Sequence, residues 1–212
     1  MPRASASYTV DVVAIAPLGR TLAVFLQRGA RDRRTLPWGV PRARAHLAAA
    51  AERVARDALG TTPAAIDQVG AFGDGMRHPS GAALSIAFAA LVTAERAAGA
   101  DGDWVPAGKL AALPERQLAM ANAALSAVRA RADLAPVAFQ LLPAAFTLSA
   151  LQETYELLLE RRLHKASFRR ALHAARLVQP IDEWRSEGRG RPAQLFRYAP
   201  RKRRDGQRGL RF

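Results

Sequence analysis

The segment between Gly39 and Gly60 constrains the fold more than any other part of the chain. Its apolar side chains recur at intervals of three and four residues, which predicts an amphipathic helix over residues 47–59 that ends at the second glycine. The apolar positions are Leu47, Ala50, Ala51, Val54 and Ala58. A helix with one apolar face needs a second layer to cover that face, and the segments on either side must supply it.

Short strand-like runs, separated by turns, lie before and after this helix. They cover residues 8–16 and 21–26 on one side, and residues 66–72 and 83–92 on the other. A second amphipathic helix is predicted over about residues 114–131. Strands on both sides of an amphipathic helix favour an α/β (α+β) sandwich over a helical bundle.

The pattern changes after residue 142. A helix capped by Thr147 or Ser149 precedes a basic turn, and a second helix over about residues 165–176 is predicted to bury one face. The residues expected on that face are Phe168, Ala171, Leu172 and Ala175. Two strand-like runs follow, joined by the arginine-bearing loop 188–192. Helix, turn, helix and hairpin together predict a winged helix-turn-helix domain.

We therefore expect two domains, residues 1–141 and residues 142–212, and their charges differ. The first carries 16 basic and 11 acidic residues, a net of +5, whereas the second carries 16 and 7, a net of +9. The total of +14 says little by itself, because 29 of the 32 basic residues are arginine and such a bias can come from a GC-rich genome. The distribution assigns polyanion binding to the C-terminal domain, which ends in a basic tail.

The composition excludes several classes of site. The chain has no cysteine, which excludes disulfides and thiolate zinc sites, and its four histidines lack the spacing of metal ligands. We expect neither a metal nor a cofactor. The apolar run 10–17 is broken by Asp11 and is too short to cross a membrane. The protein is therefore expected to be soluble, unexported and cytoplasmic.

The spacing of residues 39–60 resembles a Nudix box, the loop-helix motif of nucleoside-diphosphate hydrolases. Gly39, Arg53 and Gly60 occupy the three non-acidic positions of that motif. Other short motifs are similar to those of one family: Phe72-Gly-Asp, Arg77-His-Pro-Ser-Gly, Ala145-Phe-Thr-Leu-Ser, Ser167-Phe-Arg-Arg and Gly188-Arg-Gly-Arg-Pro-Ala. Over nearly the whole chain, this order of domains and motifs resembles the Nudix-related transcriptional regulators of NAD metabolism.

This resemblance implies a homodimeric repressor whose Nudix-like domain binds ADP-ribose as an effector. The winged helix-turn-helix of that family binds palindromic operators in double-stranded DNA, near genes of NAD synthesis or salvage. Such a regulator would be cytoplasmic, associated with the nucleoid when bound to DNA, and independent of membranes.

The glutamate positions of the box have lost their function as metal ligands. The four positions hold Ala45, Val54, Asp57 and Ala58. In an active hydrolase these carboxylates bind the cations that bridge the pyrophosphate and activate water, and Mg²⁺ needs several well-placed hard oxygens. One aspartate cannot supply them, so the domain is expected to be catalytically inactive. Arg53 is then expected to act as a scaffold, paired with Glu52 or Asp57.

The resemblance places an effector cleft on the loops that carry Arg28, Arg42 and Arg77. Their guanidinium groups could neutralise a pyrophosphate directly where no metal bridges it, and Trp38 could stack on a base. His78, beside the last of these arginines, is interpreted as part of a surface turn.

The second helix of the winged domain is interpreted as the recognition helix. Its candidate DNA contacts are Lys165, Ser167, Arg169 and Arg170. Arg170 is the first choice for reading a base, because it lies nearly opposite Phe168 and Leu172, whereas Arg169 can reach the DNA backbone. Glycines flank Arg189 and Arg191 on the wing loop, which lets these arginines approach a phosphate or the minor groove.

Two other interpretations stay open. An active Nudix hydrolase could use displaced metal ligands such as Glu52, Asp57 and Asp74, with the basic C-terminal part assisting an anionic substrate. The same architecture could also control another regulon, such as sugar catabolism, with a different phosphorylated ligand. The sequence separates this last interpretation poorly from control of NAD metabolism.

Overall fold

Strand β1 (Tyr8–Leu18) runs through the centre of the N-terminal sheet and is buried on both of its faces. The computed structural model describes residues 8–29, 33–73, 75–132, 136–186 and 192–199. Because side chains alternate along a strand, Val12 and Ala14 point to one face of the sheet while Val13 and Ile15 point to the other. All four are fully buried, so the sheet is covered on both sides.

The remaining strands complete a seven-stranded mixed sheet in the order β3-β2-β1-β6-β5, with β4 paired to β1 and β7 paired to β2. The bounds are Thr21–Arg28 for β2, Arg34–Thr35 for β3, Trp38–Gly39 for β4, Ala65–Phe72 for β5, Leu84–Leu91 for β6 and Asp103–Pro106 for β7. Only the β1–β6 pair is parallel among the strand pairs of the described sheet. The four strands expected from the sequence are confirmed.

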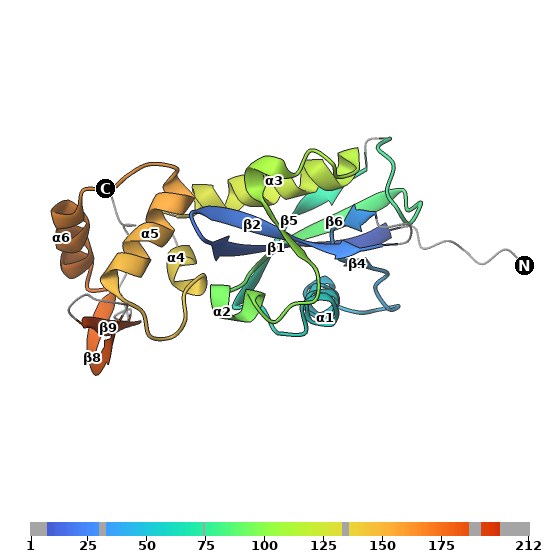
Figure 1. Ribbon diagram of the computed structural model, residues 1–212. Coiled ribbons are helices and arrows are strands. Elements are labelled where there is room, and N and C mark those ends of the chain that lie inside the picture. Colours follow the sequence, from blue (N-terminus) through green and yellow to red (C-terminus); the bar gives the residue numbers. More distant parts are fainter. Residues whose placement is uncertain (1–7, 30–32, 74, 133–135, 187–191, 200–212) are drawn as a thin grey trace, which may run out of the picture. The chain divides into compact units, whose positions relative to one another are not determined.

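Helices cover both faces of this sheet (Figure 1). α1 (Leu47–Leu59) and α2 (Ala94–Ala97) lie on one face, and α3 (Glu115–Ala130) lies on the other. A short 3₁₀ helix, η2 (Ala107–Lys109), follows β7. None of the helices in the described ranges is long and apolar enough to cross a membrane.

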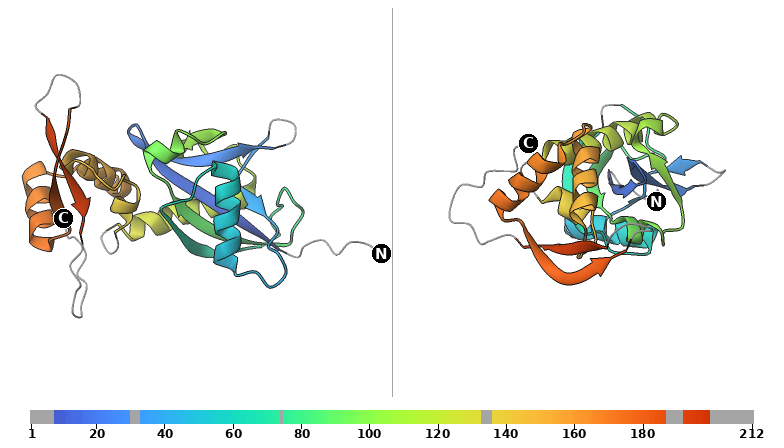
Figure 2. Two further views of the ribbon diagram at one scale, coloured as in Figure 1. Left: turned by 90° about the horizontal axis from the view of Figure 1, so that it is seen from below. Right: turned by 60° about the vertical axis from the view of Figure 1, so that its left-hand side comes forward.

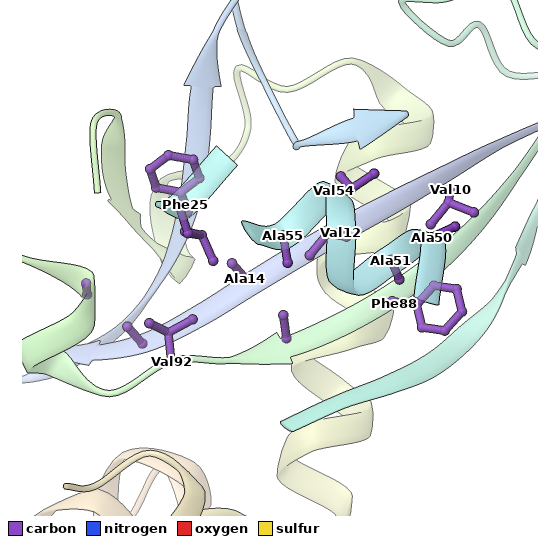
Figure 3. Close-up of a cluster of buried hydrophobic side chains, with 14 residues drawn as sticks. Val10, Val12, Ala14, Phe25, Ala50, Ala51, Val54, Ala55, Phe88 and Val92 are labelled. Atoms are coloured by element: carbon purple, nitrogen blue, oxygen red, sulfur yellow. The ribbon is translucent and has the colours of Figure 1, made fainter. Parts of the chain in front are cut away.

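The apolar face of α1 packs directly on β1 and β6 (Figure 3). Ala50, Ala51, Val54 and Ala55 of the helix share one buried cluster with Val10, Val12, Ala14 and Phe88 of the strands. The small alanine side chains let the helix approach the sheet closely. α1 ends where the sequence predicts, because Gly60 adopts a left-handed backbone (φ 66°) and donates its N–H to the Arg56 carbonyl at 2.9 Å.

The chain divides into two compact units, Met1–Val128 and Arg129–Phe212. The second unit contains α4 (Val137–Gln140), α5 (Leu148–Leu159), α6 (Lys165–Ala175), β8 (Val178–Arg185) and β9 (Ala193–Tyr198). Figure 2 shows the β8–β9 hairpin beside these helices, which is the order of a winged helix-turn-helix. α4 precedes residue 142 yet packs on the hairpin, with the Phe139 ring stacked on Tyr198 at 4.3 Å. The proposed boundary after residue 141 stays a prediction.

Two local features of this unit refine the sequence interpretation. Of the two candidate caps of α5, Thr147 is the cap, because its hydroxyl accepts a hydrogen bond from the Ala150 N–H at 3.1 Å. Phe168 and Leu172 are buried on α6 as expected. Ala175 is exposed instead, because α6 ends there and Arg176 turns away in a left-handed conformation (φ 51°).

The turn between α5 and α6 is held by the carboxylate of Glu156, whose side chain is only 11% exposed. One oxygen accepts hydrogen bonds from Gln152 Nε2 and the Leu163 N–H, both at 3.0 Å, and the other accepts from Arg162 Nη1 at 2.8 Å. Burial raises the pKa of this carboxyl, but the hydrogen bonds from Gln152, Leu163 and Arg162 bring it below its usual value. The ionised form therefore stabilises the turn.

We predict that Glu156→Gln lowers the free energy of unfolding at pH 7 by about 1–3 kcal/mol, the usual range for hydrogen bonds to a charged group. Because the folded-state pKa is depressed, this contribution is present above the unfolded-state pKa and disappears as the pH falls through the folded-state pKa. Urea unfolding of wild type and variant between pH 7 and pH 3 measures it. Glu153→Gln, an exposed change on the same helix, is the control. A difference between Glu156→Gln and wild type that persists unchanged at the acid end would contradict this role.

Candidate functional site

Several elements of the N-terminal unit meet at one end of its sheet. β1 is antiparallel to β2 and parallel to β6, so the start of β1, the end of β2 and the start of β6 share that end. β4 pairs with the start of β1, with Trp38 opposite Asp11, and marks this end in Figure 1. Arg28 is the last residue of β2, and Arg77 lies on the loop before β6. The fold therefore brings three of the four effector candidates to one end of the sheet.

The candidate arginines differ in whether they form ion pairs with neighbouring carboxylates. Arg28 is exposed and pairs with Asp103, with 3.5 Å between its Nη2 and the carboxylate. Arg34 contacts the same carboxylate at 2.8 Å. Arg42, on the loop before α1, and Arg77 are also exposed, and neither forms an ion pair within the part of the chain that the structure describes. Both guanidinium groups are thus accessible to an anion.

The loop between β4 and α1 is fixed by residues of the box. A Cβ atom at Gly39 would lie 2.9 Å from Val54 Cγ2, so only glycine lets β4 approach the helix this closely. Arg53 Nη2 donates a hydrogen bond to the Val40 carbonyl at 3.2 Å. Arg53 is therefore a scaffold residue as expected, but this hydrogen bond goes to the backbone of the loop rather than to Glu52 or Asp57.

The former glutamate positions have become part of the packing. Val54 is 7% exposed and belongs to the buried cluster under α1. Ala58 packs against the edge of that cluster, and Ala45 is half-buried on the loop. Asp57 is exposed and is the single carboxylate among the four positions. The four positions therefore offer one carboxylate where a cation site needs several hard oxygen donors.

His78 is a buried residue, not the surface decoration predicted from the sequence. Its side chain and that of Asp11 are both fully buried, with 2.8 Å between His78 Nε2 and Asp11 Oδ1. Thr9 Oγ1 donates to the other oxygen of Asp11 at 2.7 Å and lies 3.0 Å from Ser85 Oγ. The signal in the sequence was Asp11 itself, because a carboxylate within an apolar central strand requires buried partners.

The hydrogen bonds define the tautomer of His78. The Ser80 N–H donates to His78 Nδ1 at 3.1 Å, so Nδ1 is an acceptor. The Ser80 hydroxyl accepts from the Ala82 N–H at 3.2 Å and lies 2.7 Å from Nδ1, to which it can donate. With Nδ1 accepting, the neutral ring carries its proton on Nε2 and donates it to Asp11. The Trp38 ring meets the imidazole edge-on, with 5.4 Å between centroids.

In the C-terminal unit, α6 turns a polar surface to solvent. Phe168 and Leu172 are buried, whereas Lys165, Ser167, Arg169 and Arg170 are all exposed. His173 extends this exposed surface by one turn. Arg170 Nη2 lies 3.5 Å from Ser167 Oγ, which is a weak contact that leaves the guanidinium accessible. The wing candidates Arg189 and Arg191 lie outside the described residues.

Both units of the chain are similar to parts of known proteins. Residues 138–198 match the family described as the NrtR DNA-binding winged helix domain. The matched residues lie within the C-terminal unit and include most of α4, together with α5, α6 and both strands of the hairpin. The whole fold is similar to the crystal structure of Shewanella oneidensis NrtR complexed with a 27mer DNA, with a TM-score of 0.79 and 26% identity, covering 91% of this chain and 94% of that chain. The resemblance inferred from the sequence motifs is thereby confirmed.

Two further comparisons bear on the N-terminal unit and the whole chain. A MutT/nudix family protein from Enterococcus faecalis has a TM-score of 0.69 at 16% identity, covering 91% of this chain and 88% of that chain, which supports the Nudix fold alone. The ADPR responsive transcriptional repressor NtrR of Acinetobacter baylyi is 29% identical over 163 residues. That alignment spans 73% of this chain but 64% of the relative's length. By its name, this relative is a transcriptional repressor that responds to ADPR.

The Nudix fold implies a divalent cation on the box helix, and the residues present do not fit one. Ala45 and Ala58 have no donor atom, and Val54 is packed into the apolar cluster. Within the described ranges, no three histidine, aspartate or glutamate side chains converge in a way that could hold a metal ion. Binding of a pyrophosphate at this end of the sheet would have to rely on the arginines instead.

Proposed function

We propose that this protein is a DNA-binding transcriptional repressor whose N-terminal unit senses ADP-ribose or a related nucleotide. The observation that carries the proposal is the match of residues 138–198 to the NrtR winged helix domain, joined to a Nudix fold whose box keeps one carboxylate at its four acidic positions. ADP-ribose is the nucleotide left when NAD loses nicotinamide. A repressor that responds to it is suited to genes of NAD metabolism.

The DNA-binding part of the proposal rests on α6 and on charge. The exposed basic residues of α6 project from a helix that is anchored by Phe168 and Leu172. A helix presented in this way fits the major groove, where arginine pairs with guanine through two hydrogen bonds. The net charge of +9 in residues 142–212 supports binding to phosphates. We propose a homodimer on a palindromic operator, because one short helix reads only one half-site.

The sensing part rests on the end of the sheet that gathers Trp38, Arg28 and Arg77, with Arg42 on the adjoining loop. Accessible guanidinium groups can neutralise a pyrophosphate directly, and the face of the half-buried Trp38 indole can stack on adenine. We propose that the domain binds the nucleotide without hydrolysing it, because Ala45, Val54 and Ala58 cannot hold the cation that activates water.

We predict that ADP-ribose releases the protein from its operator and remains chemically intact. The operator is first selected from random duplexes, and the complex is then titrated with ADP-ribose, NAD and sugar phosphates while fluorescence anisotropy follows the DNA. ADP-ribose should lower DNA affinity, because an effector that binds the DNA-free conformation more tightly raises the population of that conformation. Sugar phosphates should have no effect.

The same mixtures, incubated with Mg²⁺ or Mn²⁺ and analysed by chromatography, test catalysis. No AMP should form. Metal-dependent turnover that disappears in Asp57→Ala would contradict the proposal and favour a hydrolase with displaced ligands. Release by a sugar phosphate but not by ADP-ribose would favour the same architecture in another regulon.

We predict that the exposed arginines of α6 make different contacts with DNA, one with a base and one with the backbone. Arg170→Ala should weaken operator binding by about 1–3 kcal/mol and relax the preference at one base pair, because a bidentate contact to a base is lost. Arg169→Ala should weaken operator and scrambled duplexes alike and reduce the salt dependence by roughly one unit of slope. Titrations of both variants at several salt concentrations measure this. Equal losses on both duplexes for Arg170→Ala would remove its assignment as a base reader.

A further inference from the structure

The loop between β5 and β6 is held from two sides by buried polar side chains. Its described part comprises Gly73 and residues 75–83, and it carries the exposed Arg77. Among the described residues, Arg77 forms no hydrogen bond or ion pair of its own that could fix its position. Its placement therefore depends on the conformation of the loop backbone.

The first support comes from α3. Arg116, which is 3% exposed, donates from Nη1 to the Ala82 carbonyl at 2.8 Å and from Nη2 to the Gly73 carbonyl at 3.3 Å. Nη2 also donates to the Met76 carbonyl. One guanidinium thus links the two ends of the loop and its first turn. An arginine buried for this purpose is costly, because its charge is removed from water and its partners named above are backbone carbonyls rather than a carboxylate.

The second support comes from β1. His78, the residue next to Arg77, inserts its ring beneath the loop and donates to Asp11, whose carboxylate is fully buried. The other ring nitrogen accepts the Ser80 N–H, so the same side chain also shapes the turn that follows. Its edge-on contact with Trp38 brings a second effector candidate against the same ring.

We propose that His78 and Arg116 are positioning residues of the effector site: they hold the β5–β6 loop so that Arg77 presents its guanidinium to the phosphates of the nucleotide. This rests on the proposed sensing function. A loop fixed before binding does not lose backbone freedom when the ligand arrives, so each residue ordered in advance favours binding. Neither positioning residue touches the ligand. Both act through Arg77.

The experiment combines variants of His78 with two measurements. His78→Leu removes all three hydrogen-bonding contacts of the ring, whereas His78→Gln keeps an amide that can donate to Asp11. Ser80→Ala removes only the hydroxyl that lies against Nδ1, so it tests the same support with a smaller change. Thr93→Ala is the matched control, because Thr93 is buried, caps α2 and follows the opposite end of β6.

Hydrogen exchange first reports on the loop without any ligand. In His78→Leu the amide of Ser80 loses its acceptor, so the amides of residues 76–82 should exchange faster than in wild type. Calorimetric titration then measures ADP-ribose affinity. His78→Leu should raise the Kd by about tenfold, the equivalent of ordering roughly one residue. His78→Gln should restore most of the affinity, Ser80→Ala should give a smaller loss, and Thr93→Ala should match wild type.

A double-mutant cycle decides whether His78 acts through Arg77. In the Arg77→Ala background, His78→Leu should cause no further loss of affinity. Losses that simply add in the double variant would overturn the proposal, as would unchanged affinity in His78→Leu despite faster exchange of the loop. Those outcomes leave the sensing function intact, because wild type still binds. Failure of wild type itself to bind ADP-ribose would remove the sensing function and this inference together.

Discussion

The buried carboxylate of Asp11 is the constraint around which the candidate effector site is arranged. It lies near the start of the central strand, and its side chain is fully buried. Its oxygens are satisfied by Thr9 and His78, so the loop carrying His78 must fold down onto β1. Trp38, directly opposite Asp11 in β4, meets the same ring. One desolvated acid thus fixes the relative positions of a strand, a loop and an aromatic side chain.

The box helix keeps the glycines and the arginine of the motif, with one carboxylate at its four acidic positions. Gly39 and Gly60 still set the approach of β4 and the end of α1, and Arg53 still holds the loop through a backbone carbonyl. Val54 stands at a position that is acidic in the Nudix box and belongs to the apolar cluster beneath the helix. A carboxylate at that position would now be buried without a metal, which is unfavourable. The fold is therefore consistent with a nucleotide-binding domain that has no cation.

Much of this architecture could be predicted from the sequence, because apolar periodicity and glycine positions are local signals. The helix bounded by Gly60 and the recognition helix anchored by Phe168 follow from them directly. The role of His78 could not be predicted in the same way, because its partner Asp11 is 67 residues away and the pairing depends on the sheet register. Arg116 was missed for the same reason: its acceptors are carbonyls of a distant loop, which leave no trace in residue type. Long-range polar contacts of this kind can be identified only when the fold is known.

The central claim is that arginines rather than a divalent cation neutralise the effector. The most direct test is calorimetric titration of ADP-ribose into the protein in buffer containing Mg²⁺ and in buffer containing EDTA. We predict the same dissociation constant in both, together with a large loss of affinity in Arg77→Ala, because the guanidinium contact does not involve a metal. Binding that requires Mg²⁺ and survives in Arg77→Ala would contradict the account.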